Sequence, residues 1–143
     1  MSHYTNIPAV TYTTAAEAIR HTIDIGAEQG VKLCATVVDP ALGLVAYGRA
    51  DGMTPHSVET SRRKAQTAAS TRKPSAAVPA ELATAMENGT GGLLTRIPGG
   101  VPLVFDGVLV GGLGVAGGPP AEDAKVADAV LEALGAAPVG DVG

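Results

Sequence analysis

Apolar residues recur at helical spacing over residues 14–30. They form one stripe, typical of a helix that packs one face against a core, made of Ala16, Ile19, Ile23 and Ala27. Thr14 and Glu17 have the spacing of a capping box, and Gly30 is placed to end the helix in the left-handed conformation. The pattern therefore predicts a helix over residues 14–30.

Two pairs of short apolar segments predict two β-hairpins. Residues 33–38 and 44–49 flank a turn-forming stretch that contains Asp39, Pro40 and Gly43. Residues 101–105 and 108–115 flank Asp106-Gly107, a pair typical of the type I′ turn, in which both central residues take a positive φ. These segments are the predicted strands.

Further helices are predicted between and after the hairpins. One covers residues 55–70, begins with Thr54-Pro55 and ends before Pro74, and a shorter one covers residues 79–89. A last helix covers residues 121–134. This order of elements is typical of an α/β domain in which helices cover one mostly antiparallel sheet. Residues 136–143 are predicted to form a disordered tail.

Length and composition restrict the class of protein. The chain has 143 residues, which suits a single domain, and its 3% aromatic residues and net charge of −4 argue against nucleic-acid and membrane partners. Cys34 is the only cysteine, which excludes an intramolecular disulfide and a cysteine-based metal cluster. Because no long apolar run and no secretory signal are visible, we expect a cytoplasmic protein.

Half of the basic residues lie within twelve positions, at Arg62, Arg63, Lys64, Arg72 and Lys73. Consecutive residues of a helix point about 100° apart, so these side chains cannot all face one ligand. They form either a solvated basic face or an anion-binding rim for carboxylates or propionates. The acidic residues of the last predicted helix would complement this basic helix in self-association, namely Glu122, Asp123, Asp128 and Glu132.

Glycine is concentrated in and after the last predicted strand, at Gly111, Gly112, Gly114, Gly117 and Gly118. Glycine weakens a strand by about 0.5–1 kcal/mol relative to alanine, so the run needs a physical reason. Two reasons compete. Either the alanine-rich helix over residues 55–70 lies very close to the strand, or a flat ligand lies on a surface without side chains.

Of the three histidines, His3 and His21 are predicted to be solvated. His56 is predicted in the first turn of a helix, where the positive end of the helix dipole favours a neutral imidazole that can act as base or metal ligand. A plain surface histidine is the alternative. Asp51 is most simply a turn residue, and Cys34 a small buried hydrophobe.

Six short motifs follow one another along the chain: Val37-Val38-Asp39, Gly43-Leu44-Val45-Ala46, Arg49-Ala50-Asp51-Gly52, Arg63-Lys64-Ala65-x-Thr67-Ala68, Gly99-Gly100-Val101-Pro102 and Gly111-x-x-Gly114-Val115-x-Gly117. Their succession resembles the GlcG/HbpS-like family, a haem-binding or haem-degrading type of domain that also forms the C-terminus of PduO proteins. The resemblance covers residues 12–135, as a single domain.

This resemblance implies a three-layer α/β/α fold with a mostly antiparallel five-stranded sheet, assembly into homo-oligomers, and binding of haem or, as a second choice, a cobalamin-type tetrapyrrole. Carried onto this sequence, it implies a cofactor site made of Arg49, Lys64, Ser75, Gly99, Gly100, Pro102, Gly111 and Gly114. Some members hold iron with a Glu-x-x-Glu motif. The matching positions here are Glu59 and Arg62, so we predict no metal site.

Two classes of function remain open. The first is a small-ligand-binding protein of the GlcG/HbpS type, which binds haem or a related tetrapyrrole. The second is a cofactor-independent enzyme of the isomerase or lyase type, which moves a proton on a carboxylate metabolite with Lys64, His56 and Asp51 as acid–base groups. A structural oligomer that has lost its site is a third alternative.

Overall fold

The structure of the chain, a computed structural model, describes residues 2–141. In chain order the helices and strands are α1 (Tyr12–Glu28), β1 (Cys34–Val38), β2 (Leu44–Arg49), α2 (Ser57–Thr71), α3 (Ala83–Gly89), β3 (Gly100–Phe105), β4 (Val108–Ala116) and α4 (Pro120–Leu134). The short 3-10 helices are η1 (Ser75–Ala77), η2 (Ala80–Leu82) and η3 (Val139–Asp141). None of the helices in the described residues is long and apolar enough to cross a membrane.

The sheet is antiparallel throughout and has the strand order β2-β1-β4-β3. It has four strands within residues 2–141, so the five-stranded sheet implied by the resemblance is wrong for this chain. The segment nearest to a fifth strand is the one before α1. The Val10 N–H donates to the Val110 carbonyl at 2.8 Å, but the chain turns into α1 directly afterwards and no strand forms.

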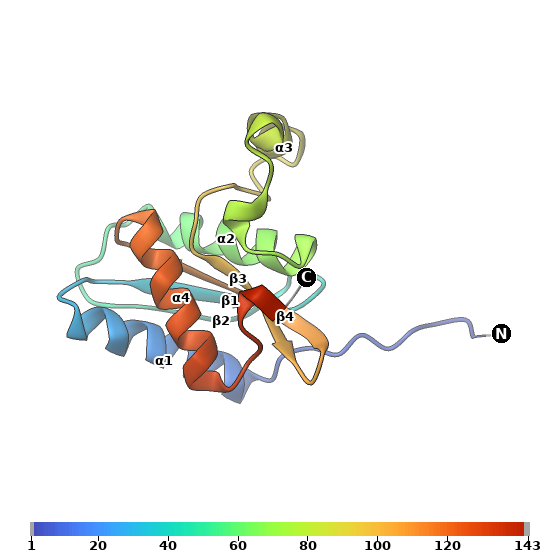
Figure 1. Cartoon of the computed structure of the whole chain (residues 1–143), viewed down its shortest axis with the longest axis horizontal. Coiled ribbons are helices and arrows are strands. Elements are labelled where there is room, and N and C mark those ends of the chain that lie inside the picture. The colour runs from blue at the N-terminus through green and yellow to red at the C-terminus, as the bar shows by residue number, and fades with distance from the viewer. Residues whose placement is uncertain (1, 142–143) are drawn as a thin grey trace.

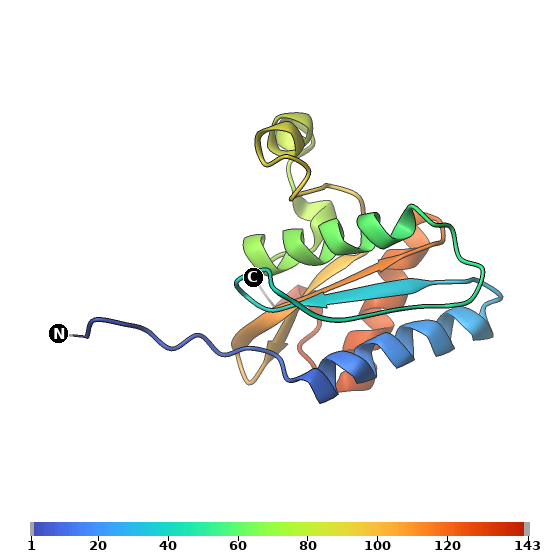
Figure 2. The same cartoon turned by 180° about the vertical axis from the view of Figure 1, so that it is seen from behind.

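Helices cover both faces of the sheet, as predicted. α2 packs on β4, β1 and β3 on one face, whereas α1 and α4 pack on the other (Figures 1 and 2). The larger apolar core lies on the α1–α4 side, where Val37, Leu103 and Leu113 of the sheet meet Ile19 and Leu131 of the helices. The α/β class and the antiparallel sheet flanked by helices are confirmed.

Local turn chemistry accounts for the element boundaries. Asp106 and Gly107 have φ values of 53° and 75°, which confirms the tight turn between β3 and β4. Gly30 has a φ of 73° and follows α1 as predicted. The start of α1 differs: the Thr14 N–H donates to Thr11 Oγ1 at 3.2 Å, so Thr11 caps the helix and the predicted Thr14–Glu17 capping box is wrong.

The segment after α4 is packed against the domain. Ala136 is buried with the α1–α4 core, and the Ala137 N–H donates to the Val104 carbonyl of β3 at 2.9 Å. These residues fall within the predicted disordered tail, but burial and this hydrogen bond join them to the sheet. Residues 142–143 of that tail lie outside the described residues.

Candidate functional site

The inner side of α2 lies against a glycine-lined part of the sheet. A Cβ atom on Gly112 would overlap the Ala65 carbonyl oxygen, and one on Gly114 would overlap the Ser61 carbonyl oxygen. Both oxygens belong to α2. The space beside these glycines is therefore filled by the helix backbone, which supports the close-helix interpretation of the glycine run and leaves no room there for a flat ligand.

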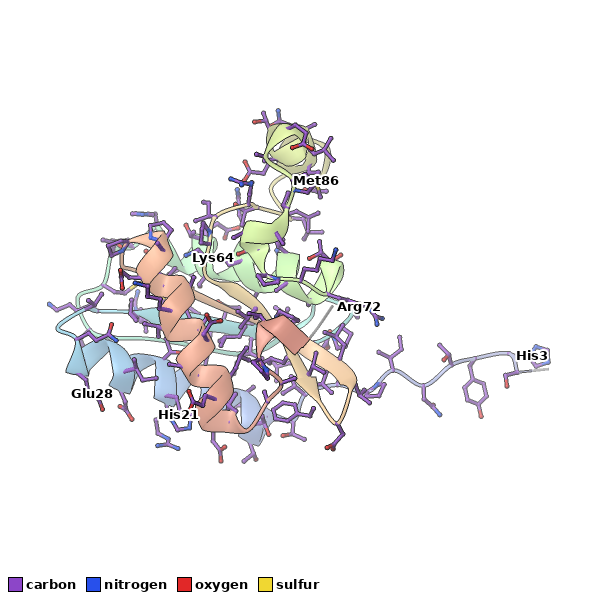
Figure 3. All side chains as sticks on the ribbon, in the orientation of Figure 1. His3, His21, Glu28, Lys64, Arg72 and Met86 are labelled. Atoms are coloured by element: carbon purple, nitrogen blue, oxygen red, sulfur yellow. The ribbon has the colours of Figure 1, made fainter. Side chains whose placement is uncertain are left out.

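Lys64 lies inside this interface and is 1% exposed (labelled in Figure 3). Its ammonium donates to the Val115 carbonyl at 2.7 Å and to Asp123 Oδ2 at 3.2 Å. Asp123 is buried as well, and its Oδ1 accepts from the Gly118 N–H at 3.1 Å. This pair joins α2, the end of β4 and the first turn of α4 across the sheet edge.

Burial dominates the electrostatics of this ion pair. Desolvation lowers the pKa of Lys64, and the nearby Asp123 carboxylate offsets part of that effect. Desolvation raises the pKa of Asp123, and Lys64 and the Gly118 N–H offset part of it. Because both charges face each other away from water, Lys64 holds α2 to β4 and α4. Its ammonium is not accessible to a ligand in solvent.

Other residues of the predicted cofactor site also belong to this interface. A Cβ on Gly99 would come within 2.9 Å of Lys64 Nζ, and one on Gly100 would overlap the Lys64 carbonyl. Ser75 is fully buried, donates to the Ile97 carbonyl at 2.6 Å and accepts from the Gly100 N–H at 2.9 Å. These contacts fasten the segment after α2 to the start of β3.

The remaining predicted cofactor residues are dispersed. Pro102 is buried in β3, and the space beside Gly111 is filled by the Val38 carbonyl of β1. Arg49 is exposed at the end of β2. The structure thus brings Lys64, Ser75, Gly99, Gly100 and Gly114 together as a packing interface. The eight predicted cofactor residues do not together form an open surface.

The outer side of α2 borders an open cleft. The cleft has a volume of about 340 Å³ and lies between the first turns of α2 and the segment that contains α3 and residues 95–97. Figures 1 and 2 show α3 standing clear of the body beyond α2. The residues that line the cleft are His56, Glu59, Thr60, Arg63, Glu87, Thr95 and Ile97.

Charges in this cleft are partly paired. Glu59 accepts from Arg62 and, at 3.3 Å, from Nε of Arg63. Thr95 Oγ1 donates to Glu87 at 2.8 Å. All three members of the Glu59–Arg62–Arg63 group are substantially exposed, so these ion pairs contribute little to stability. The cleft therefore offers an imidazole and an exposed apolar side chain, Ile97, beside two carboxylates and a guanidinium that is already paired with Glu59.

The three residues predicted as acid–base groups do not share a surface. His56 and Asp51 are exposed near the start of α2, whereas Lys64 is enclosed between α2 and the sheet. The positions of the family's Glu-x-x-Glu motif hold a Glu59–Arg62 ion pair, in which a guanidinium replaces the second carboxylate. Within residues 2–141, no group of three His, Cys, Asp or Glu residues is arranged to hold a metal ion.

Four residues of this site were not assigned their roles from the sequence: Asp123, Thr67, Thr95 and Glu87. Asp123 was predicted only as one of four acidic residues for self-association, and nothing local distinguishes it from Glu122, although only Asp123 is buried. Thr67 was missed as the residue whose Oγ1 accepts from the Thr95 N–H at 2.8 Å and so fixes the far wall of the cleft. Thr95 itself, like Glu87, lies in a stretch without a motif.

The fold and site together define a small three-layer α/β domain with a closely packed helix–sheet interface and an open cleft. A family model described as "Haem degrading protein HbpS-like" matches residues 10–132. The chain belongs to the HbpS-like family. No curated protein matches the chain.

Solved structures agree with this assignment. A crystal structure of HbpS is 30% identical, with 92% of this chain and 94% of that chain covered and a TM-score of 0.82. A double mutant of HbpS from Streptomyces reticuli is 29% identical, covers 94% and 92%, and has a TM-score of 0.83. A PduOC complex with haem is 21% identical, covers 91% and 98%, and has a TM-score of 0.83, which shows a shared fold.

Proposed function

We propose that this protein binds haem, or a related tetrapyrrole, in the cleft between α2 and the α3 segment. The observation that carries the proposal is that the cleft joins a nitrogen donor, a cation and an apolar side chain on one open surface, which Glu59 and Glu87 also line. Membership of the HbpS-like family and a structural neighbour solved with haem support this ligand class. The cleft volume of about 340 Å³ lies in the range of small-ligand sites.

The residues of the cleft fit the chemistry of a haem. Histidine imidazoles commonly bind haem iron, and His56 would supply an exposed imidazole for it. Arg63, whose Nε is paired with Glu59, would hold a propionate carboxylate through the rest of its guanidinium, and Ile97 would provide apolar contact for a macrocycle. Haem, when bound, supplies redox-active iron. The chain's own part is to hold and orient the ligand.

This site replaces the cofactor surface proposed from the glycine-rich strand. Gly112 and Gly114 face the backbone of α2, and Lys64 is paired with Asp123, so neither a flat ring nor a propionate has access to them. For the same reason, Lys64 is not accessible to act as an acid–base group in the enzyme hypothesis. Within the described residues, the exposed cleft is the place where His56 and a basic side chain meet.

The test is a visible-absorbance titration of the metal-free protein with hemin, beside a cobalamin titration. We expect a saturable Soret shift for the wild type, an altered Soret position and at least about tenfold weaker binding for His56→Ala, and a several-fold weaker affinity for Arg63→Ala. His21→Ala, a substitution on α1, is the matched control and should bind like the wild type. Unchanged binding by both cleft variants would place the ligand elsewhere, and no saturable shift would rule out haem.

A further inference from the structure

The first residues of the chain form an extended arm. Residues 2–9 are all exposed, and they carry two large apolar side chains, Tyr4 at 81% and Ile7 at 63% exposure. Val10 joins the arm to the body through its hydrogen bond to Val110. Figures 1 and 3 show the arm leading away from the domain, with His3 near its far end. Apolar side chains held in water in this way favour a partner surface.

The two edges of the sheet differ in how they are covered. The outer strand β3 is buried along most of its length, and its Val104 carbonyl accepts from Ala137. The opposite outer strand, β2, has β1 as its hydrogen-bonded neighbour, and most of its residues are half-buried, with Leu44 at 66% and Arg49 exposed at its two ends. An uncovered edge strand presents free N–H and C=O groups to any extended segment.

An apolar groove runs beside this free edge. It has a volume of about 520 Å³ and is lined by residues 44–47 of β2 and by Tyr12, Ala16 and Ile19 of α1. None of the lining residues carries a charge, and neither does any residue from 4 to 9 of the arm. Contact between residues 4–9 and the groove would therefore bury no charged side chain.

We propose that residues 4–9 of one copy lie along β2 of a second copy as an added edge strand, with Ile7 in the groove between α1 and β2. Residues 4–9 of the arm match the six residues of β2 in length. Pro8 lacks an N–H group, which an outermost strand tolerates. The arm leads into α1, whose first residue, Tyr12, lines the groove, and Figure 1 shows the arm extending away from the body, so two copies can exchange arms about a two-fold axis.

Self-association measured by sedimentation over a range of protein concentrations tests this exchange. We expect Ile7→Asp and Leu44→Asp each to weaken it by about tenfold or more, because each places a charge in an apolar contact. Leu82→Asp is the matched control: Leu82 is an exposed apolar residue of η2, at 49%, and should leave association unchanged. A monomeric wild type, or association that only Leu82→Asp weakens, would overturn the proposal.

A disulfide cross-link between two differently sized chains identifies the occupant of the groove. One chain carries Ile7→Cys and the other, extended by a tag, carries Leu44→Cys; the native Cys34 is buried and does not interfere. We expect mild oxidation of the mixture to give the mixed-size dimer as the main product. If instead no mixed dimer forms, and a chain with both substitutions cross-links within itself, the arm folds back on its own groove and the exchange is wrong.

Discussion

The two sides of α2 differ in burial and in the partners of their charged side chains. On the inner side, Lys64 is enclosed with Asp123, and glycines allow the helix backbone to touch the sheet. On the outer side, the adjacent Arg63 is exposed at the rim of a cleft with His56. Neighbouring residues in one basic run thus meet different environments because a helix turns about 100° per residue. A charge cluster in sequence does not define a charged surface.

The largest expected effect comes from separating the buried ion pair. Lys64→Met should lower the free energy of unfolding by about 3–5 kcal/mol, because Asp123 is left as an uncompensated buried charge. Arg63→Met, the matched substitution on the outer side, should change it by less than about 0.5 kcal/mol. Urea unfolding of both variants measures the difference. Equal losses at the two positions would contradict the contrast between the two sides of α2.

The close contact between α2 and β4 predicts the next effect. Gly114→Ala should lower the free energy of unfolding by about 1–3 kcal/mol, because its Cβ would overlap the Ser61 carbonyl and force the helix away from the sheet. Gly89→Ala is the control, since nothing lies near its Cβ position and alanine favours a helix. Thermal unfolding compares the two variants. If Gly114→Ala were as stable as the wild type, the interface between α2 and β4 would have space for an additional methyl group.

A smaller effect concerns the thiol beneath the start of α2. Burial raises the pKa of Cys34 above its ordinary value of 9.0. The folded protein therefore keeps the thiol proton at a pH where the unfolded chain has lost it, and stability falls as the pH rises above 9. Relative to Cys34→Ala, the wild type should lose up to about 1 kcal/mol between pH 9 and pH 10.

The control for this prediction is the same pair of proteins below pH 8, where the thiol is protonated in both states. There, the difference in unfolding free energy between wild type and Cys34→Ala should not depend on pH. A constant difference up to pH 10 would mean that Cys34 loses its proton as readily in the folded protein as in the unfolded chain.

Local signals predicted most of the fold. Asp106-Gly107 favours one turn geometry regardless of the rest of the chain, the apolar stripe at helical spacing located α1, and Thr54-Pro55 and Pro74 located α2. The start of α1 was wrong because Thr11 and Thr14 are both good caps, and local sequence does not choose between them. The absence of a fifth strand depends on where the chain leaves the sheet after Val10.

The candidate site was less predictable than the fold. His56 and Lys64 were both identified, but their environments depend on residues far along the chain. Asp123 is 59 positions from Lys64, and Thr95 is 28 positions from Thr67. Sequence spacing carries no information about such pairs until the sheet order is known. The cleft was therefore missed, and buried packing residues were predicted to bind a cofactor.

The sequence by itself determined the class of fold, the two hairpins, the helices and the family, because these depend on periodicity, turn chemistry and short motifs. Only the tertiary structure decided which glycines serve helix packing, that Lys64 is an interior cation, and that Arg63 and His56 line an open cleft. The physical reason is that burial and ion pairing arise from contacts between distant segments. Such contacts exist only after the sheet and its two helical layers have assembled.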